Sequence, residues 1–188
     1  MKVRVPLLVE VSADDVDNAI NDNEWTVEQA VVDDIGKPIF KRWSLEDGTA
    51  VQYICDGNVD VAYILVSGER AEATAKHVNK QLSSWSIKDI RAYAKWASAR
   101  EDMVIALHLI GLIGSDEFDG ELYGHLERGF THEDPQVRKA AVLAASYLHW
   151  PQVTTMAHQL ATADPEDDVR EAAAELVPPH LLEGGAEA

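Results

Sequence analysis

The chain of 188 residues is long enough for one large domain or two small ones, since domains commonly contain about 100–150 residues. Its 33 acidic residues against 16 basic ones give a net charge of −17, which disfavours binding to nucleic-acid phosphates or anionic lipid. The longest apolar run, Met103 to Gly114, is too short for a bilayer, which needs about 20 residues, and residues 1–12 lack the features of an export signal. Cys55 is the single cysteine, which is typical of a reducing compartment, so we expect a cytoplasmic protein.

Residues 1–84 are expected to form a small α+β domain built on an antiparallel sheet. Short runs rich in β-branched and aromatic residues predict strands at Lys2–Val11, Ile39–Ser44, Thr49–Cys55 and Asp60–Val66. Glu46-Asp47-Gly48 and Asp56-Gly57-Asn58 separate the last three runs, and Asp-Gly is typical turn chemistry between antiparallel strands. The sheet therefore follows from strands and turns that alternate along the chain.

Helices are predicted between and after these strands. Ser12 is a suitable N-cap for an acidic helix that starts at Ala13. We expect a break near residues 21–23 and a second helical segment from Thr26 to about Asp34. Glu69–Leu82 is rich in Ala, Glu and Lys, which favours a further helix. The predicted order is β-α-β-β-β-α, with the helices on one face of the sheet.

From Trp85 onward the sequence predicts helices and short turns only. The stripe Val137, Ala140, Ala141, Ala144, Tyr147, Leu148 has helical spacing, and the stripe Val169, Ala172, Ala173, Leu176, Val177 repeats its start. A weaker copy begins at Met103, so the three copies start 34 and then 32 residues apart. Further helices are predicted at 87–98, 117–130 and 152–162. A period of this length is the signature of a helical solenoid, here over residues 85–182, followed by a flexible tail at 183–188.

The segments "DPQVRKAAVLAAS" and "DPEDDVREAAAEL" resemble the second helix of HEAT repeats, with their Asp-Pro lead, Val-Arg pair and stripe of small residues. The resemblance covers residues 85–178 and implies a solenoid of three helical hairpins. It also implies that Arg138 and Arg170 tie neighbouring repeats together. The first copy departs from the pattern, because Val104 stands where the arginine belongs.

The helix around Met103–Ile113 is apolar on nearly every side, which is typical of a helix buried on two faces. We therefore expect the N-terminal domain to pack on the first repeat and to cap the solenoid.

No residue pattern indicates a catalytic, metal or cofactor site. The seven histidines form no two-histidine zinc motif, and no nucleophile elbow, phosphate-binding loop or dinucleotide fingerprint occurs. Cys55 ends a predicted strand, where a cysteine is usually a small packed apolar residue. We therefore expect a protein that is not an enzyme and that carries no cofactor.

Acidic side chains are concentrated in three parts of the chain. Val5–Gly36 contains nine acids and no Lys or Arg, Glu101–Glu127 contains seven acids and no base, and a third cluster surrounds Asp167. A generic acidic surface and the preference of helix N-termini for anions explain part of this pattern. The part of the pattern that these two effects leave unexplained predicts a binding surface for a basic partner. Its candidate residues are Glu10, Asp14, Asp15, Asp17, Asp22, Glu24, Trp25, Asp116, Glu117, Asp119, Glu121, Asp167 and Asp168.

The function we expect is a non-catalytic protein-protein interaction module. Within that class we favour a small acidic bacterial inhibitor or immunity-type protein that binds a basic protein such as a toxin or a nucleic-acid enzyme. An adaptor or chaperone-like HEAT scaffold fits nearly as well, and an acidic mimic of nucleic acid is a third reading. A HEAT-like enzyme of the bilin-lyase type, acting on a small molecule, also stays open. DNA binding in the manner of a HEAT-like glycosylase is disfavoured, because the chain after Trp85 contains eight basic residues against eighteen acidic ones.

Overall fold

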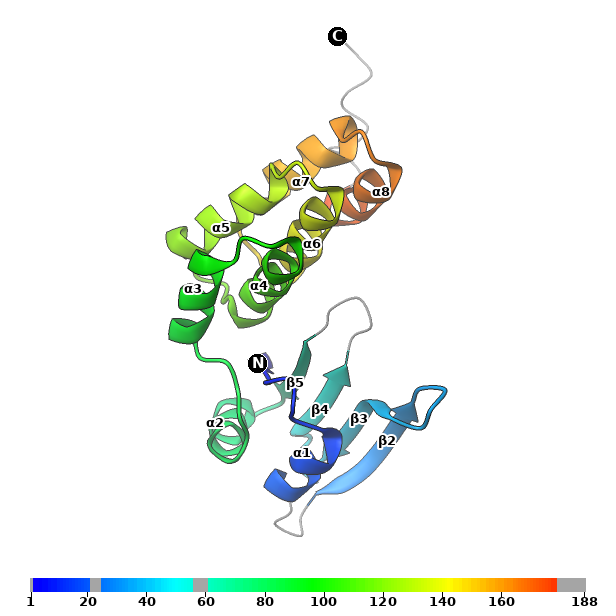
Figure 1. The fold of residues 1–188 in the computed structure, drawn as a ribbon. Coiled ribbons are helices and arrows are strands. Elements are labelled where there is room, and N and C mark those ends of the chain that lie inside the picture. The colour runs from blue at the N-terminus through cyan, green and yellow to red at the C-terminus, as the bar shows by residue number, and fades with distance from the viewer. Residues whose placement is uncertain (1, 21–24, 56–60, 179–188) are drawn as a thin grey trace. The chain divides into compact units, whose positions relative to one another are not determined.

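The computed structural model describes residues 2–20, 25–55 and 61–178 (Figure 1). The chain divides into two compact units, Met1–Ser86 (unit 1) and Ile87–Ala188 (unit 2). Unit 1 contains an antiparallel sheet and two helices, whereas unit 2 is helical. The predicted α+β class is therefore confirmed.

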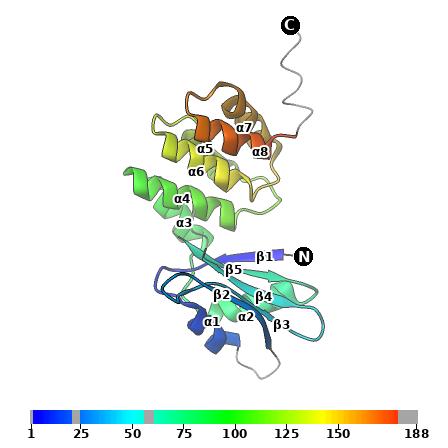
Figure 2. The same ribbon diagram turned by 90° about the vertical axis from the view of Figure 1, so that its right-hand side faces the viewer.

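The sheet of unit 1 has five strands, which lie in the spatial order β1-β5-β4-β3-β2, each antiparallel to its neighbour. They are β1 (Lys2–Pro6), β2 (Thr26–Val32), β3 (Pro38–Ser44), β4 (Ala50–Cys55) and β5 (Ala62–Ser67). The helices α1 (Ala13–Ile20) and α2 (Ala71–Gln81) lie on one face of the sheet (Figure 2). Trp43, Val51 and Ile64 are buried between that face and the helices, because alternate residues of a strand point to the same side.

Local sequence signals account for several of these elements. Asp15 accepts hydrogen bonds from the backbone and hydroxyl of Ser12 at 2.8 and 2.6 Å, so the predicted start of α1 is confirmed. The turn between β3 and β4 places Gly48 at φ 81°, and the Asp47 carboxylate accepts from the Thr49 N–H at 2.8 Å. The second Asp-Gly turn, at residues 56–58, lies outside the described residues.

The prediction of a helical segment from Thr26 to Asp34 is wrong. Residues 26–32 form β2, which pairs with β3 along its whole length. Every residue of β2 is exposed, so the segment has no buried face and therefore no periodicity of burial to distinguish strand from helix. Pairing with β3 decides the outcome, and a turn at Asp33–Gly36, with Gly36 at φ 83°, joins the two strands.

Other predicted boundaries shift by a few residues. The first strand ends at Pro6 rather than at Val11, since Leu7 forms only an isolated bridge with Ser84. The division between the units falls after Ser86, two residues beyond the predicted position. The predicted tail at 183–188 lies outside the described residues.

Unit 2 contains six helices among the residues described. They are α3 (Ile87–Trp96), α4 (Arg100–Ile113), α5 (Gly120–Phe130), α6 (Pro135–Ala145), α7 (Pro151–Ala163) and α8 (Asp167–Leu176). Each odd-numbered helix packs on the helix that follows it, α4 and α8 pack on either side of α6, and α5 contacts both α3 and α7. Figure 2 shows α4, α6 and α8 following one another along the unit. None of the helices in the described part of the chain is long and apolar enough to cross a membrane.

Small residues allow these helices to approach closely. Val137, Ala141 and Ala144, from the predicted stripe of α6, are fully buried. A Cβ added to Gly111 of α4 would lie 2.6 Å from the Ala144 carbonyl oxygen, so only glycine fits at this crossing. The expectation that unit 1 caps the solenoid concerns the placement of the two units and stays a prediction.

Candidate interaction surfaces

Asp17 connects α1 to the sheet rather than standing free at the surface. Its carboxylate accepts a hydrogen bond from Trp43 Nε1 at 2.6 Å and forms an ion pair with Lys41. Trp43 is only 2% exposed, so its indole N–H requires an acceptor inside the unit. Asp17 therefore contributes to the fold, and its charge is compensated there by Lys41.

The other predicted acids of α1 differ in what they contact. Asp15 is held by Ser12, whose side-chain and then backbone hydrogen bonds lower the pKa of the carboxyl group. Glu10 and Asp14 are exposed and form no ion pair with another described residue. Asp22 and Glu24 lie outside the described residues. Within this predicted cluster, Glu10 and Asp14 are thus the described carboxylates that are open to a partner.

Trp25, the predicted aromatic anchor, packs against the core of unit 1. Its side chain is partly buried beside Ile20 and Val78, and it lines a small cavity of about 210 Å³ together with Arg70 and His77. Much of the indole surface is therefore in contact with other residues of unit 1.

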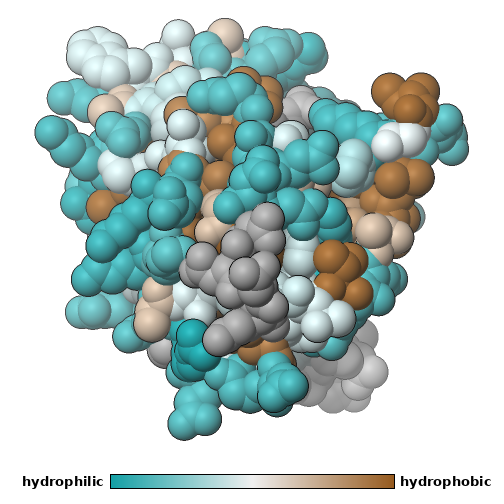
Figure 3. Space-filling model, turned by 90° about the horizontal axis from the view of Figure 1, so that it is seen from below, coloured by the Kyte–Doolittle hydropathy of each residue, from teal (hydrophilic) through white to brown (hydrophobic). Residues whose placement is uncertain are grey.

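The surface that sequence reasoning missed is β2. This strand forms one edge of the sheet, and its seven residues are all exposed. Val27, Val31 and Val32 are 51%, 40% and 52% exposed, and Ile35 in the following turn is 88% exposed. Figure 3 shows apolar side chains gathered along its right-hand margin, the side on which β2 and its turn lie in Figure 1. The β-branched residues on both sides of the Asp33–Gly36 turn were the sequence signal that could have revealed this hairpin.

The one charged residue of β2 is bound to the neighbouring strand. Glu28 accepts hydrogen bonds of 2.6 Å from both Ser44 and Arg42. The Ser44 hydroxyl, followed by the Arg42 guanidinium, lowers the pKa of this carboxyl group. Glu28 is thereby held against β3, and the outer edge of β2 carries no cation or proline.

In unit 2 the predicted acids of the Glu101–Glu127 region serve mainly local structure. Asp119 is the N-cap of α5, where it accepts from the N–H groups of Glu121 and Leu122 at 3.0 and 3.1 Å and pairs with Arg91. Burial is the largest single influence on the pKa of Asp119 and raises it, but the Leu122 N–H, Arg91 and the Glu121 N–H together outweigh burial, so the pKa is lowered. Glu121 also contacts Arg91, at 3.2 Å.

The remaining predicted acids of unit 2 are more exposed. Asp116 pairs with His149 at 2.8 Å, while Asp167 and Asp168 contact Arg170 and Lys139. Because both side chains of the Asp116–His149 pair are at least three-quarters exposed, water screens it strongly. Glu117 forms no ion pair with another residue in the described ranges. The exposed acids therefore belong to both units.

An enclosed charged pair, Arg138 and Asp164, links two of the connections between helices in unit 2. Arg138 donates to both carboxylate oxygens of Asp164, at 2.6 and 2.9 Å, and to the carbonyls of His132 and Glu133, each at 2.8 Å. The two side chains are 9% and 1% exposed. The Arg138 hydrogen bonds are the largest influence on Asp164 and lower its pKa. This arginine thus joins the α5–α6 turn to the α7–α8 turn.

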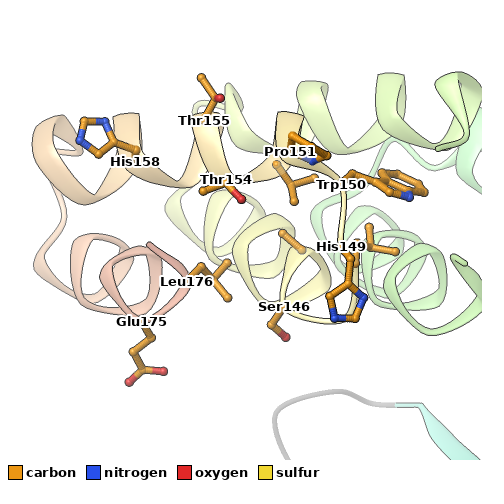
Figure 4. Close-up of a pocket in the computed structure, with 12 residues that line it drawn as sticks. Ser146, His149, Trp150, Pro151, Thr154, Thr155, His158, Glu175 and Leu176 are labelled. Carbon is orange, nitrogen blue, oxygen red and sulfur yellow. The ribbon is translucent and has the colours of Figure 1, made fainter. Parts of the chain in front are cut away.

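A groove of about 870 Å³ lies between α6, α7 and α8 (Figure 4). Leu148, Trp150 and Val153 give it an apolar wall, and Thr154 and Leu176 are directed toward it from α7 and α8. The Trp150 indole N–H donates to the carbonyls of Ser115 and Glu117 at 3.0 and 3.1 Å, which fixes the ring. The groove offers apolar contact area together with a few hydroxyl and imidazole groups.

Across residues 2–20, 25–55 and 61–178, no group of three or more His, Cys, Asp or Glu side chains is placed to hold a metal ion. The Ser146 hydroxyl at the groove donates to the Leu143 carbonyl of its own helix, at 2.7 Å. No protein-family model, curated protein or solved structure matches this chain.

Proposed function

We propose that this chain is a non-catalytic protein-binding module that recognises a basic protein partner, in the manner of a small acidic inhibitor or immunity-type protein. The observation that carries the proposal is the combination, within unit 1, of an acidic region that lacks bases and an exposed apolar edge strand. Nine acids and no base occur between Val5 and Gly36. In the described part of the chain, Lys41 and Arg42 of β3 compensate Asp17 and Glu28, whereas no described cation pairs with the other acids of this region, which are Glu10, Asp14, Asp15, Asp33 and Asp34.

The physical role of this charge is to steer the partner. A field of one sign increases the rate of association and is screened by salt. The exposed valines of β2, directly followed in the chain by Asp33 and Asp34, offer apolar contact area, which a purely solvating acidic surface would not need.

The test begins with affinity capture and cross-linking from the source cell, followed by association kinetics with the purified partner. We expect a basic partner whose association rate falls steeply from low to high ionic strength. Asp14→Lys should slow association several-fold at low salt. Glu171→Lys is the control, since it makes the same change in net charge on an exposed position of unit 2. An acidic partner, or a rate indifferent to salt and to Asp14→Lys, would overturn the proposal.

We further propose that unit 2 is a HEAT-like solenoid of three hairpins, α3–α4, α5–α6 and α7–α8. The packing of α4, α6 and α8 in succession supports this reading. So does the place of Arg138, which joins successive turns through Asp164 as the resemblance implies. Arg170 differs, since the Asp164 carbonyl and Asp167, which it contacts, lie within its own α7–α8 hairpin. A scaffold of this kind would also suit an adaptor or chaperone subunit.

A second candidate function is the binding of a small molecule in the α6–α8 groove. Its volume of about 870 Å³ lies within the range of typical ligand sites, about 300–1,000 Å³. The two candidates separate in a binding experiment that follows the fluorescence of Trp150 together with backbone amide shifts. A small ligand should perturb residues of α7 and α8, whereas the proposed protein partner should perturb α1 and β2.

A further inference from the structure

Among the strands that the structure describes, β2 has a neighbour on one side only. β2 is the last strand of the sheet, so its ladder to β3 uses only half of its N–H and C=O groups. Leu45 N donates to Thr49 O at 2.8 Å, so the backbone groups of Leu45 point toward β4. Because the direction of the N–H and C=O groups alternates along a strand, those of Trp43 and Lys41 also point toward β4. Those of Arg42 and Phe40 point toward β2 and bond with it.

The residues of β2 that face away from β3 follow from the same alternation. Gln29 and Val31 stand opposite Arg42 and Phe40, so their N–H groups point inward, and those of Ala30 and Val32 point outward. The hydrogen bond from Asp33 N to Lys37 O, at 2.9 Å, places Asp33 in the same inward set as Val31 and Gln29. The hydrogen bond in the β3–β4 turn and the one in the β2–β3 turn therefore give the same assignment of inward and outward N–H groups.

The edge lacks the usual protection against strand pairing. Natural edge strands are commonly blocked by lysine, by proline or by a covering element. β2 contains neither residue, and its seven positions are exposed. It does carry an extra residue, Glu28, between Val27 and Gln29, and a second register shift follows between Val31 and Val32, but the register from Gln29 to Val31 is regular. The open segment is therefore the C-terminal half of the strand.

The surrounding charge selects what could pair there. Asp33 and Asp34 follow the strand, with Lys37 directly after their turn, and Glu28 within the strand is already paired with Arg42. The attraction therefore comes from Asp33, Asp34 and the net charge of −17. A second copy of the chain, paired through β2, would bring two such sets of acids together. A segment that carries lysine or arginine would instead be attracted to them.

We infer that β2 is the docking edge for an extended, basic segment of the protein partner, which joins the sheet as an additional strand. This inference rests on the proposed function and names its contact. Main-chain hydrogen bonds at Ala30 and Val32 supply the attachment. Alternate apolar side chains of the segment pack on the exposed valines, and its lysine or arginine side chains reach the nearby acids.

The experiment uses the full chain and a peptide of the length of β2 in which lysine and valine alternate. A second peptide of the same composition carries N-methyl groups on the amides of one edge, so it keeps the charge but loses those donors. At low ionic strength we expect the first peptide to bind and to slow hydrogen exchange at the Ala30 and Val32 amides. The N-methylated peptide should bind at least about tenfold more weakly, because it loses several main-chain hydrogen bonds at once.

A matched pair of variants tests the protein side. Ala30→Pro removes one outward N–H and should weaken the first peptide about fivefold, whereas Ala30→Val keeps that N–H and should not weaken it. Amide spectra of both variants should match the parent chain outside β2. If Ala30→Pro disturbs the fold, the two peptides compared on the parent chain still decide the question.

The outcomes separate this inference from the proposed function. Equal binding of both peptides would overturn strand addition while leaving recognition of a basic partner in place. Absence of binding by either peptide would overturn the inference, and the salt dependence of the captured partner would still test the function. A self-associated chain that Ala30→Pro dissociates would assign the edge to a second copy and would also overturn it.

Discussion

Unit 1 and unit 2 close their interiors in different ways. Unit 1 fills the space between sheet and helices with large side chains such as Trp43 and Ile64, and it leaves the outer edge of β2 unpaired. Unit 2 brings helices together at small residues, as where Gly111 meets Ala144. At such a contact the backbones of two helices meet directly, and no flexible side chain can move aside. We therefore expect unit 2 to tolerate few substitutions where its helices cross. Unit 1 keeps an open strand, and this is why we place the partner contact there.

The hydrogen-bonded carboxylates of the two units also differ in how exposed they are to water. Asp17 of unit 1 is 34% exposed at the margin of the core, whereas Asp164 of unit 2 is 1% exposed. A charge that is enclosed depends on its partner much more strongly than one that water can reach. The following predictions use this contrast.

The largest effect is expected for Arg138→Ala. It leaves the Asp164 carboxylate buried without its cation, which should lower the free energy of unfolding by about 3–5 kcal/mol. Thermal and denaturant unfolding measure this loss. Arg100→Ala is the control, because Arg100 pairs with Glu101 at the surface and should matter far less. Equal losses in the two variants would contradict the special place of the Arg138–Asp164 pair.

A smaller loss is expected for Gly111→Ala. The new Cβ would lie 2.6 Å from the Ala144 carbonyl oxygen, so the helices must separate, at a cost of about 1–3 kcal/mol. Gly124→Ala in α5 is the matched control, since a Cβ there meets nothing within 4 Å. This variant should be stabilised by about 0.5–1 kcal/mol, because alanine favours a helix over glycine. Two changes of the same sign in chemical denaturation would show that the crossing is not tight.

In unit 1 we expect Asp17→Ala to lower the free energy of unfolding by about 1–3 kcal/mol, since it leaves the buried Trp43 N–H without its acceptor. Asp14→Ala should change it by less than about 0.5 kcal/mol, because Asp14 is exposed. The near-ultraviolet signal of Trp43 gives a second measurement of the same contact. A larger loss for Asp14 than for Asp17 would be incompatible with this description of α1.

The smallest effect is a dependence on pH. The pKa of Asp164 is lower in the folded chain than its unfolded value of about 3.9, so the folded state gains from the ionised form. This contribution is complete above about pH 4 and is lost as the pH falls toward the folded pKa. Asp164→Asn should therefore show a flatter decline of stability in that acidic range. An unchanged pH profile would indicate that the carboxyl is not stabilised by Arg138.

Much of unit 2 follows from the sequence because its signals are local. The spacing of Val137, Ala141 and Ala144 defines a buried face by helical geometry alone, and all three residues are buried. Asp134 before Pro135 marks the start of α6, and the structure has this residue as the N-cap. The predicted start of α1 at Ser12 is correct for the same reason.

The candidate surface was much less predictable. Counting acids identified the Val5–Gly36 region, but the count does not distinguish Asp17, which Trp43 and Lys41 bind from β3, from Asp14, which faces solvent. Trp25 likewise packs on the core of unit 1. Those roles depend on residues far away in the chain, and a single sequence does not state which of them meet.

The sequence by itself determined the α+β class, the helical stripes of unit 2 and the Asp47-Gly48 turn, because each depends on neighbours within a few residues. Only the tertiary structure decided that residues 26–32 form a strand and that this strand lies at the edge of the sheet. The physical reason is that β2 has no buried face of its own: its conformation comes from hydrogen bonds with β3, and its open side from having no further strand beyond it.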